Sequence, residues 1–142
     1  AEVAQSEGVD LPASDVRMLI VAGEPGGCIP STRQQIETAW GAKVVDHYGL
    51  TEVGPVAIET PVCVGDMEVM TEDYHAEIID PVTLQPTPDG LTGELVLTNL
   101  GRFGSPLIRY RTGDIVKGER TSNGNLFLRG GILGRADDMI QI

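Results

Sequence analysis

A tyrosine, a hydroxyl and a carboxylate stand close together in the segment Tyr48-Gly49-Leu50-Thr51-Glu52. An aromatic ring can stack on a nucleotide base, and a nearby hydroxyl can hydrogen-bond a phosphate. The carboxylate is a suitable ligand for Mg²⁺, which keeps water and phosphate oxygens as its other ligands. The glycine lets the backbone turn tightly. This order of residue types favours a nucleotide site over the alternative, a core tyrosine followed by a polar loop.

A second carboxylate, Asp114, follows a glycine at the end of the run Pro106–Thr112. One carboxylate can accept hydrogen bonds from both hydroxyls of a ribose, as acidic residues do in dinucleotide sites. The alternative is a surface ion pair with a neighbouring arginine, which contributes little. Arg109 and Arg111 fall on the same face of the predicted strand, so one of them is expected to be structural.

Two loops add weaker signals. The glycine-rich loop Ala22–Gly27 would let the backbone approach a flat ring or a phosphate closely, although such loops are also common connections between a strand and a helix. The loop Gly134–Asp138 contains Arg135, whose five donors suit ribose and phosphate oxygens. Taken alone, this second loop is equally well read as an ordinary polar connection.

The hydrophobic pattern predicts the elements that would position these groups. The run from Arg17 to Ala22 is typical of a buried strand in a parallel sheet. Ser31 and Gln34 form a predicted capping box at the start of a helix that Gly41 ends. Residues 43–48 form the next predicted strand. In such a strand–helix–strand unit, ligands bind at the carboxyl ends of the strands, where the glycine-rich loop and the tyrosine segment stand.

After residue 55 the pattern changes to short strands separated by turn signals, including a hairpin turn at Ser122–Gly124. The predicted strands are residues 56–59, 67–70, 76–79, 94–98, 107–110, 115–119 and 125–128. The predicted fold class is α+β, with part of a parallel α/β sheet followed by an antiparallel sheet or distorted β-barrel. We expect three parts: an α/β portion at 1–55, a β-barrel-like portion at 56–133 and a hinge at 134–142.

Composition restricts the classes of function. The chain has 142 residues, of which 41% are hydrophobic, as in a folded domain with a core. Its net charge of −11 argues against a nucleic-acid partner, because phosphate backbones require clustered Lys and Arg. No apolar run approaches the roughly 20 residues of a membrane span, and the first residues do not resemble a signal peptide. We therefore expect a cytoplasmic protein with no membrane partner.

The two cysteines, Cys28 and Cys63, are expected to be free thiols. A zinc site that combines them with His47 and His75 is not supported, because no Cys-x-x-Cys or His-x-x-x-His spacing is present. Two interpretations of His47 remain open: a side chain that faces a ligand pocket, or a buried structural histidine.

The four motif segments occur together and in a fixed order, and in this they resemble the core motifs of the adenylate-forming superfamily. That superfamily includes acyl-CoA ligases, luciferases and the adenylation domains of peptide synthetases. The resemblance covers nearly the whole chain, from about Val16 onward. The run Pro106–Asp114 is most similar to the phenylacetate-CoA ligase branch, as is Glu77–Pro81 leading into Gly93–Leu97. Members make an acyl-AMP from a carboxylate and Mg-ATP, release pyrophosphate and pass the acyl group to the thiol of coenzyme A.

The resemblance implies a role for each motif residue, beginning with those around the adenine. Gly23, Glu24 and Pro25 would line the adenine and acyl pocket. Tyr48 would face the adenine ring, with Gly49 beside it in the same cofactor-binding segment.

The remaining roles concern the phosphate, the metal and the ribose. Thr51 would contact the α-phosphate and Glu52 would bind Mg²⁺, which makes these two the expected catalytic residues. Asp114 would hold the ribose hydroxyls, and Arg135 would reach the ribose or a phosphate. Asp137 would be the hinge about which a small C-terminal domain rotates between the two half-reactions.

One departure from the family pattern concerns the acyl substrate. Members of the phenylacetate branch often carry an additional residue after the glutamate, whereas here Glu52 runs directly into Val53-Gly54-Pro55. Because this segment borders the acyl pocket, two substrates remain open: an aryl acid such as phenylacetate, or an unrelated carboxylate.

Three alternatives to the complete CoA ligase also remain. The acyl group can pass to the phosphopantetheine of a carrier protein, or the protein can be a nucleotide-binding relative without catalysis. The chain can also be a structural fragment that dimerises through exposed core, so a homodimer is a further expectation. The family's phosphate loop with its lysine and the C-terminal domain with its lysine are expected outside this sequence. We therefore interpret the chain as the rear half of a nucleotide-binding domain, ending at the hinge and inactive by itself.

Overall fold

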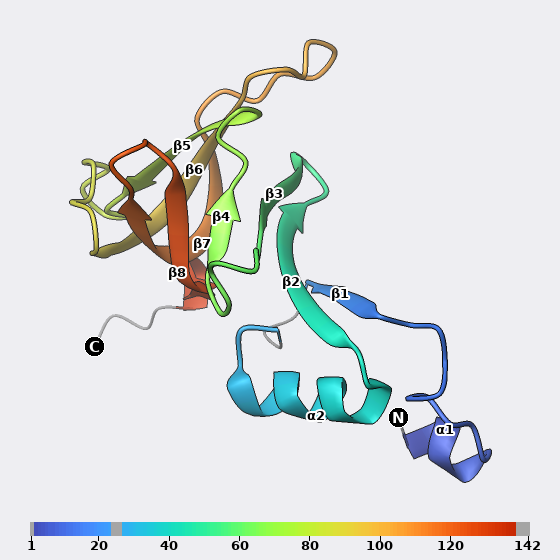
Figure 1. The fold of residues 1–142 in the computed structure, drawn as a ribbon. Helices are drawn as coiled ribbons and strands as arrows, with labels where there is room; N and C mark the ends of the chain where they lie inside the picture. Colours follow the sequence, from blue (N-terminus) through green and yellow to red (C-terminus); the bar gives the residue numbers. More distant parts are fainter. Residues whose placement is uncertain (1, 24–26, 139–142) are drawn as a thin grey trace.

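The computed structural model describes residues 2–23 and 27–138, and within them eight strands form one mixed sheet (Figure 1). The elements are α1 (Glu2–Ser6), β1 (Met18–Ala22), α2 (Pro30–Trp40), β2 (Lys43–Leu50), β3 (Gly54–Ile58), β4 (Met67–Val69), β5 (Tyr74–Ile79), β6 (Thr92–Asn99), β7 (Tyr110–Arg120), β8 (Leu126–Arg135) and the 3-10 turn η1 (Ala136–Asp138). The strand order is β1-β2-β3-β4-β8-β7-β6-β5, so within the described residues the sheet has two ends and does not close into a barrel.

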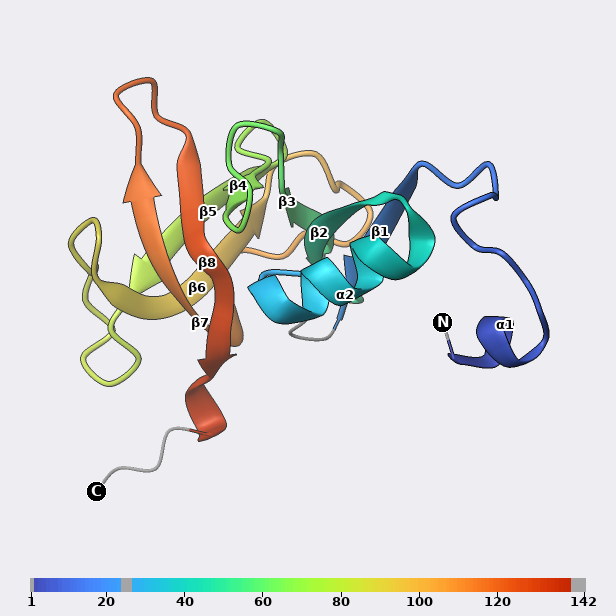
Figure 2. The same cartoon turned by 60° about the horizontal axis from the view of Figure 1, so that its bottom comes forward.

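The predicted strand–helix–strand unit is confirmed. β1 and β2 pair in parallel, with Met18 opposite Lys43, and α2 connects them across one face (Figures 1 and 2). The helix ends at Gly41, which takes a left-handed φ of 61° and donates its N–H to the carbonyl of Glu37, as the glycine predicted. Every other strand pair is antiparallel, which confirms the α+β class.

The predicted capping box at the start of α2 is wrong. The N-cap is Ile29, which makes no side-chain capping hydrogen bond, and Pro30 occupies the first turn. Proline suits that position because its fixed φ is helical and its missing N–H would have no partner there. Ser31 and Gln34 therefore lie inside the helix.

In the described residues, the β-rich part contains fewer strands than predicted, and all of them except β4 are longer than predicted. Residues 107–109 do not belong to a strand, because Arg109 takes a left-handed φ of 51° that an extended strand does not allow. The predicted strand 115–119 is part of β7, which starts at Tyr110 and passes through Gly113 at a φ of 74° with a shift in register. That glycine produces a bulge and not a turn. The hairpin at 122–124 is confirmed, since Gly124 donates to the carbonyl of Thr121 between β7 and β8.

Most residues of the hydrophobic core belong to the β-rich part. Its largest fully buried side chains include Leu95 and Leu97 on β6 and Leu126 and Leu128 on β8. Tyr48 at the end of β2 belongs to the same cluster. The carboxyl end of β2 is therefore packed against the β-rich part, although it originates in the α/β unit.

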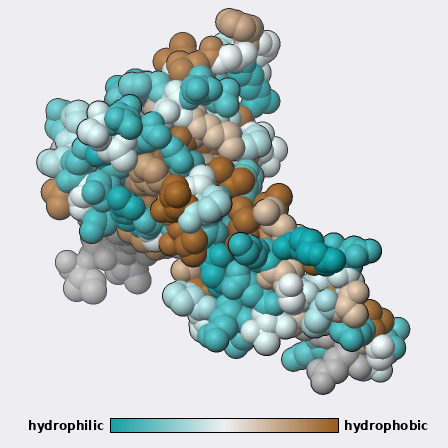
Figure 3. Space-filling view, in the orientation of Figure 1, coloured by the Kyte–Doolittle hydropathy of each residue, from teal (hydrophilic) through white to brown (hydrophobic). Residues whose placement is uncertain are grey.

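β1 departs from its predicted burial. Met18 is 56% exposed and Ile20 65% exposed, because β1 is an end strand and its alternate side chains have no cover in the described residues. Figure 3 shows apolar residues gathered near the junction between the α/β unit and the β-rich part. Among the described helices, none has the length and apolar character needed to cross a membrane.

Candidate functional site

Three strands bring Tyr48, Asp114 and Arg135 into direct contact. The Tyr48 hydroxyl on β2 donates to Oδ2 of Asp114 on β7 at 2.6 Å. Arg135 at the end of β8 donates from Nη1 to Oδ1 of the same carboxylate at 2.9 Å and to the carbonyl of Thr112 at 3.1 Å. Antiparallel pairing places Asp114 opposite Arg135 in the β7–β8 ladder. The sequence predicted all three as nucleotide contacts, and the fold assembles them into one cluster.

Burial and charge determine the protonation of this cluster. The pKa of Tyr48 is raised, first by burial and then by its hydrogen bond to the Asp114 carboxylate, so the phenol remains a neutral donor. The pKa of Arg135 is raised by the same carboxylate. Asp114 is 4% exposed and thus depends on these two donors to compensate its burial. The cluster presents a fixed, hydrogen-bonded carboxylate at the junction of β2, β7 and β8.

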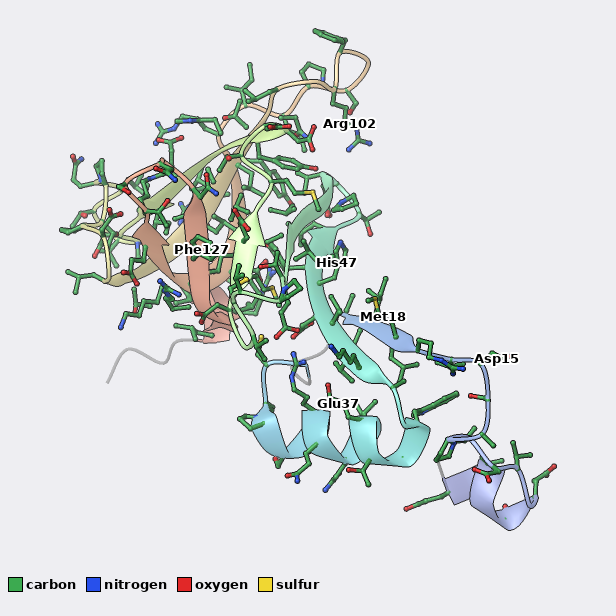
Figure 4. All side chains as sticks on the ribbon, viewed as in Figure 1. Asp15, Met18, Glu37, His47, Arg102 and Phe127 are labelled. Carbon is green, nitrogen blue, oxygen red and sulfur yellow. The ribbon has the colours of Figure 1, made fainter. Side chains whose placement is uncertain are left out.

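An open cavity of about 590 Å³ lies beside this cluster. Its wall includes Gly23, His47, Tyr48, Asp114 and Arg135. The volume falls in the range of small-molecule sites. His47 is half-buried on β2 and contributes to the wall, as the first of its two interpretations requires; Figure 4 marks its position.

A polar network between α2 and the segment after β3 was not found from the sequence. Arg33 on α2 donates to the carbonyl of Gly27 at 2.8 Å and pairs with Glu59 at 2.5 Å. Burial alone would raise the pKa of Glu59, but hydrogen bonds from Arg33 and from the N–H groups of Asp46 and Gly65 outweigh it and lower the pKa. No spacing rule connects a helix arginine with a glutamate 26 residues away, so only the tertiary structure identifies this pair.

A bulge in β8 contributes to the cavity wall and was also not predicted. Val116 pairs with Ile132 and Gly118 with Leu128, so β8 advances by more residues than β7 over the same stretch. The additional length is accommodated by Gly130 and Gly131, both left-handed at φ 72° and 71°. The adjacent glycines in the sequence are the signal that could have indicated it.

Thr51 and Glu52 are placed differently from the other predicted residues. They lie in the turn between β2 and β3, both exposed, and within the described residues neither forms part of the cavity wall. They follow Leu50, which does line the cavity. Gly49 is required where β2 and β3 meet, because a Cβ there would lie 2.7 Å from the carbonyl oxygen of Gly54.

Of the remaining predicted residues, Gly23 and Asp137 belong to the described part of the chain. Gly23 lines the wall at a left-handed φ of 86°, whereas Glu24 and Pro25 lie outside the described residues. Asp137 is exposed in η1, directly after β8, and its role as a hinge stays a prediction.

Both arginines of the Asp114 motif have other partners. Arg111 pairs with the buried Glu94, and Arg109 with Glu77 at 3.0 Å. The cation next to Asp114 is Arg135. The expectation that one of these arginines is structural therefore extends to both.

The cysteines and histidines do not gather around a common point. Cys28 and Cys63 are free thiols, and burial together with the neighbouring Asp46 raises the pKa of Cys28 to about 12. Over residues 2–23 and 27–138, no three His, Cys, Asp or Glu side chains lie close enough to hold a metal ion together.

Comparison with known proteins shows that the chain is similar to AMP-binding enzymes. Residues 2–103 match the family model described as AMP-binding enzyme. Phenylacetate-coenzyme A ligase from Pseudomonas putida is 35% identical over 144 residues, which cover all of this chain and 32% of that protein. The same enzyme from Aromatoleum evansii is 36% identical and covers 95% of this chain and 31% of its own length. The chain thus spans about a third of the length of the curated relatives that it matches.

Solved structures of CoA ligases are also similar to this chain. An open conformation of 2-hydroxyisobutyryl-CoA ligase, in complex with 2-HIB-AMP and CoA, superposes with a TM-score of 0.90 at 31% identity over 99% of this chain and 34% of that one. A benzoate CoA ligase from Burkholderia xenovorans LB400 superposes with a TM-score of 0.62 at 21% identity over 92% of this chain and 28% of that one, a likeness of fold alone.

Proposed function

The chain belongs to the AMP-binding enzyme family, and we propose that it carries the adenosine half of the active site of an AMP-forming acyl-CoA ligase. Because the chain spans about a third of its relatives, the activity is proposed for a full-length protein that contains it. That protein would activate a carboxylate with Mg-ATP and then form the coenzyme A thioester. The named activity of the relatives favours an aryl acid such as phenylacetate, and a role in aromatic acid catabolism.

The observation that carries this proposal is the cluster of Tyr48, Asp114 and Arg135 on one cavity wall. The fixed carboxylate of Asp114 would accept both hydroxyls of the ribose. Each carboxylate oxygen has two lone pairs, and the cluster uses one on each oxygen. Two acceptor positions therefore remain for two ribose hydroxyls. The ring of Tyr48 would face the adenine while its hydroxyl orients Asp114.

The phosphate end of the site is assigned to the β2–β3 turn. Thr51 would hydrogen-bond the α-phosphate, and Glu52 would hold Mg²⁺. The donor set fits this ion, because Mg²⁺ is commonly bound by one or two carboxylates together with water and phosphate oxygens, not by an all-protein cage. Bound there, the ion would neutralise charge on the phosphates. Thr51 and Glu52 themselves would orient the triphosphate next to the fixed adenosine.

The proposed chemistry has two steps. A carboxylate oxygen of the substrate attacks the α-phosphorus of ATP, and the bond to pyrophosphate breaks, which gives an acyl-AMP. The thiol of coenzyme A, after losing its proton, then attacks the acyl carbon and releases AMP. Preorganised donors near the α-phosphate stabilise the charge that develops there. Asp137 is the proposed hinge between the two steps.

A pyrophosphate-release assay on the full-length protein with Mg-ATP tests the proposal. The panel contains aryl acids, 2-hydroxy acids and aliphatic acids, and at least one acid should give turnover. Asp114→Asn should weaken AMP binding by about tenfold or more in calorimetry, while Asp89→Asn on a remote turn should not. Binding of AMP without turnover on any acid would favour the non-catalytic alternative. Product masses with coenzyme A and with a phosphopantetheine carrier protein distinguish the two acyl acceptors.

Three accompanying expectations can be tested directly. The 142-residue chain by itself should release no pyrophosphate above background in the same assay. A cytoplasmic location suits its free thiols Cys28 and Cys63 and can be tested by fractionation. A homodimer through the exposed face of β1 would appear as a doubled mass in light scattering.

A further inference from the structure

The turn between β2 and β3 is held by groups from a distant part of the chain. Thr51 and Glu52 are exposed, so packing of their own side chains does not fix the turn. Within the turn, the backbone supplies the bond from the Val53 N–H to the carbonyl of Leu50 at 3.2 Å. The carbonyls of Glu52 and Val53 instead accept hydrogen bonds from side chains that follow them by 21 to 50 residues.

The inner contact comes from Tyr74 at the start of β5. Its hydroxyl donates to the carbonyl of Val53 at 2.7 Å, and its side chain is 6% exposed. Burial, followed by the charge of Asp73, raises the pKa of Tyr74, so the phenol stays protonated and can donate. Asn99 at the end of β6 approaches the same carbonyl with Nδ2 at 3.5 Å. The Val53 carbonyl is thus anchored from inside the β-rich part.

The outer contact comes from Arg102 in the loop between β6 and β7. Its Nη1 donates to the carbonyl of Glu52 at 2.5 Å, and Figure 4 shows the side chain on the loop above the β2–β3 turn. The loop itself has little packing around its tip, where Phe103 is 91% exposed. Its base is closed by the bond from the Asn99 N–H to the carbonyl of Leu107 at 3.0 Å. Arg102 therefore connects this loop to the turn.

Two consecutive peptide planes are fixed by these contacts. The Glu52 carbonyl belongs to the plane that joins residues 52 and 53, and the Val53 carbonyl to the next plane. Because each peptide unit is planar, holding both oxygens restrains the backbone torsions of Val53 and the course of the chain directly after Glu52. The turn is thereby oriented from the β-rich part, although it extends from β2.

We propose that Tyr74 and Arg102 are positioning residues that orient Thr51 and Glu52 toward the phosphates and Mg²⁺ of bound ATP. The inference rests on the proposed function, since it assigns a purpose to the orientation of that turn. Neither residue belongs to the sequence motifs, and both act through backbone carbonyls without contacting the ligand. Their loss should disturb the phosphate end of the site and leave the adenosine end, at Asp114, unchanged.

The test compares Tyr74→Phe and Arg102→Ala in the full-length protein with two matched controls. Tyr110→Phe removes a tyrosine hydroxyl that makes no hydrogen bond within the described residues, and Arg109→Ala removes an exposed arginine of the same loop. Each positioning variant should raise the Mg²⁺ concentration needed for half-maximal pyrophosphate release by about three- to tenfold, the effect of one lost hydrogen bond. The affinity for AMP in calorimetry should stay within about twofold, and Arg102→Lys should restore part of the loss.

Hydrogen exchange gives a readout that does not depend on activity. The amides of residues 51–54 should exchange about three- to tenfold faster in both positioning variants than in the wild type and the controls. Unchanged exchange in this turn overturns the proposal, whether or not the protein turns over. A lower Tm with unchanged Mg²⁺ dependence overturns it as well, because a merely structural role would do that. If the wild-type protein releases no pyrophosphate, the proposed ligase activity is rejected. The exchange result then decides by itself whether Tyr74 and Arg102 hold the turn.

Discussion

The α/β unit and the β-rich part of this chain differ in how they are held. In the described residues of β1 and α2 no side chain is buried, whereas β6 has five consecutive buried residues from Gly93 to Leu97. The helix α2 is instead tied to the segment after β3 by polar contacts such as the pair of Arg33 and Glu59. Yet the α/β unit contributes Tyr48 and the Thr51–Glu52 turn to the candidate site. The α/β unit thus supplies part of the candidate site, whereas most of the packing around the site belongs to the β-rich part.

Truncation of a core leucine is the strongest test of this difference. Leu95→Ala should destabilise the chain by about 2–5 kcal/mol, because its side chain is fully buried between β-rich strands. Ile20→Ala on β1 should cost less than about 0.5 kcal/mol, since Ile20 is 65% exposed. Urea unfolding of both variants provides the measurement. Equal losses of unfolding free energy in the two variants would contradict the difference in packing between the β-rich part and β1.

Removal of Arg33 tests the polar attachment of the α/β unit. Arg33→Ala leaves the buried carboxylate of Glu59 without its cation and the carbonyl of Gly27 without its donor. We expect a loss of about 3 kcal/mol, as for other broken buried pairs. The matched control is Arg17→Ala, an arginine of the same part whose ion pair with Asp15 is exposed. A loss for Arg33→Ala no larger than for the control would show that packing, and not this pair, attaches α2.

The same pair makes stability depend on pH. The folded-state pKa of Glu59 lies below its ordinary value, so its contribution is complete above the pKa of an unfolded glutamate, about 4.3. It declines as the pH falls from there through the lower folded pKa, because the unfolded chain takes up the proton first. Urea midpoints measured from pH 7 to pH 3 should fall less steeply in Glu59→Gln. A slope identical to that of the wild type would contradict the assignment.

The smallest expected effect concerns the bond that joins the two parts at the site. Tyr48 on β2 and Asp114 on β7 should show a coupling of about 1–2 kcal/mol in a double-mutant cycle of Tyr48→Phe and Asp114→Asn. The measured quantity is the free energy of unfolding, with AMP affinity as a second readout. If the losses in unfolding free energy of the two single variants are additive, the hydrogen bond between Tyr48 and Asp114 does not stabilise the contact between the two parts.

The local pattern of the sequence predicted much of the architecture. The strand–helix–strand unit, the end of α2 at Gly41 and the hairpin at 122–124 follow from periodicity and turn residues, which act over a few positions. The same reasoning failed at Arg109, whose left-handed conformation breaks an apparently regular strand, and at Ile29, which replaces the predicted cap. The division of the chain into parts at 55 and 133 remains a prediction. One continuous sheet crosses both positions, with position 55 inside β3 and position 133 inside β8.

The order of motif residues indicated Tyr48, Asp114 and Arg135 as members of one site, because the residue types suit a ribose and a base. Their roles toward a nucleotide stay proposals, while their contact with one another is a property of the fold. Thr51 and Glu52 were predicted beside them but lie outside the cavity wall in the described residues. Whether a side chain reaches a cavity depends on the path of the backbone and on the groups that hold it.

The sequence by itself determined which chemical groups are available and which strands and turns carry them, since both are local properties of residue type and spacing. Only the tertiary structure decided that Arg135, and neither Arg109 nor Arg111, is the cation next to Asp114. It alone revealed that α2 is attached through Glu59. It also revealed that Tyr74 and Arg102 donate hydrogen bonds to backbone carbonyls of the β2–β3 turn. These contacts join residues 21 to 50 positions apart, and their partners are selected by strand order and register, which no local pattern specifies.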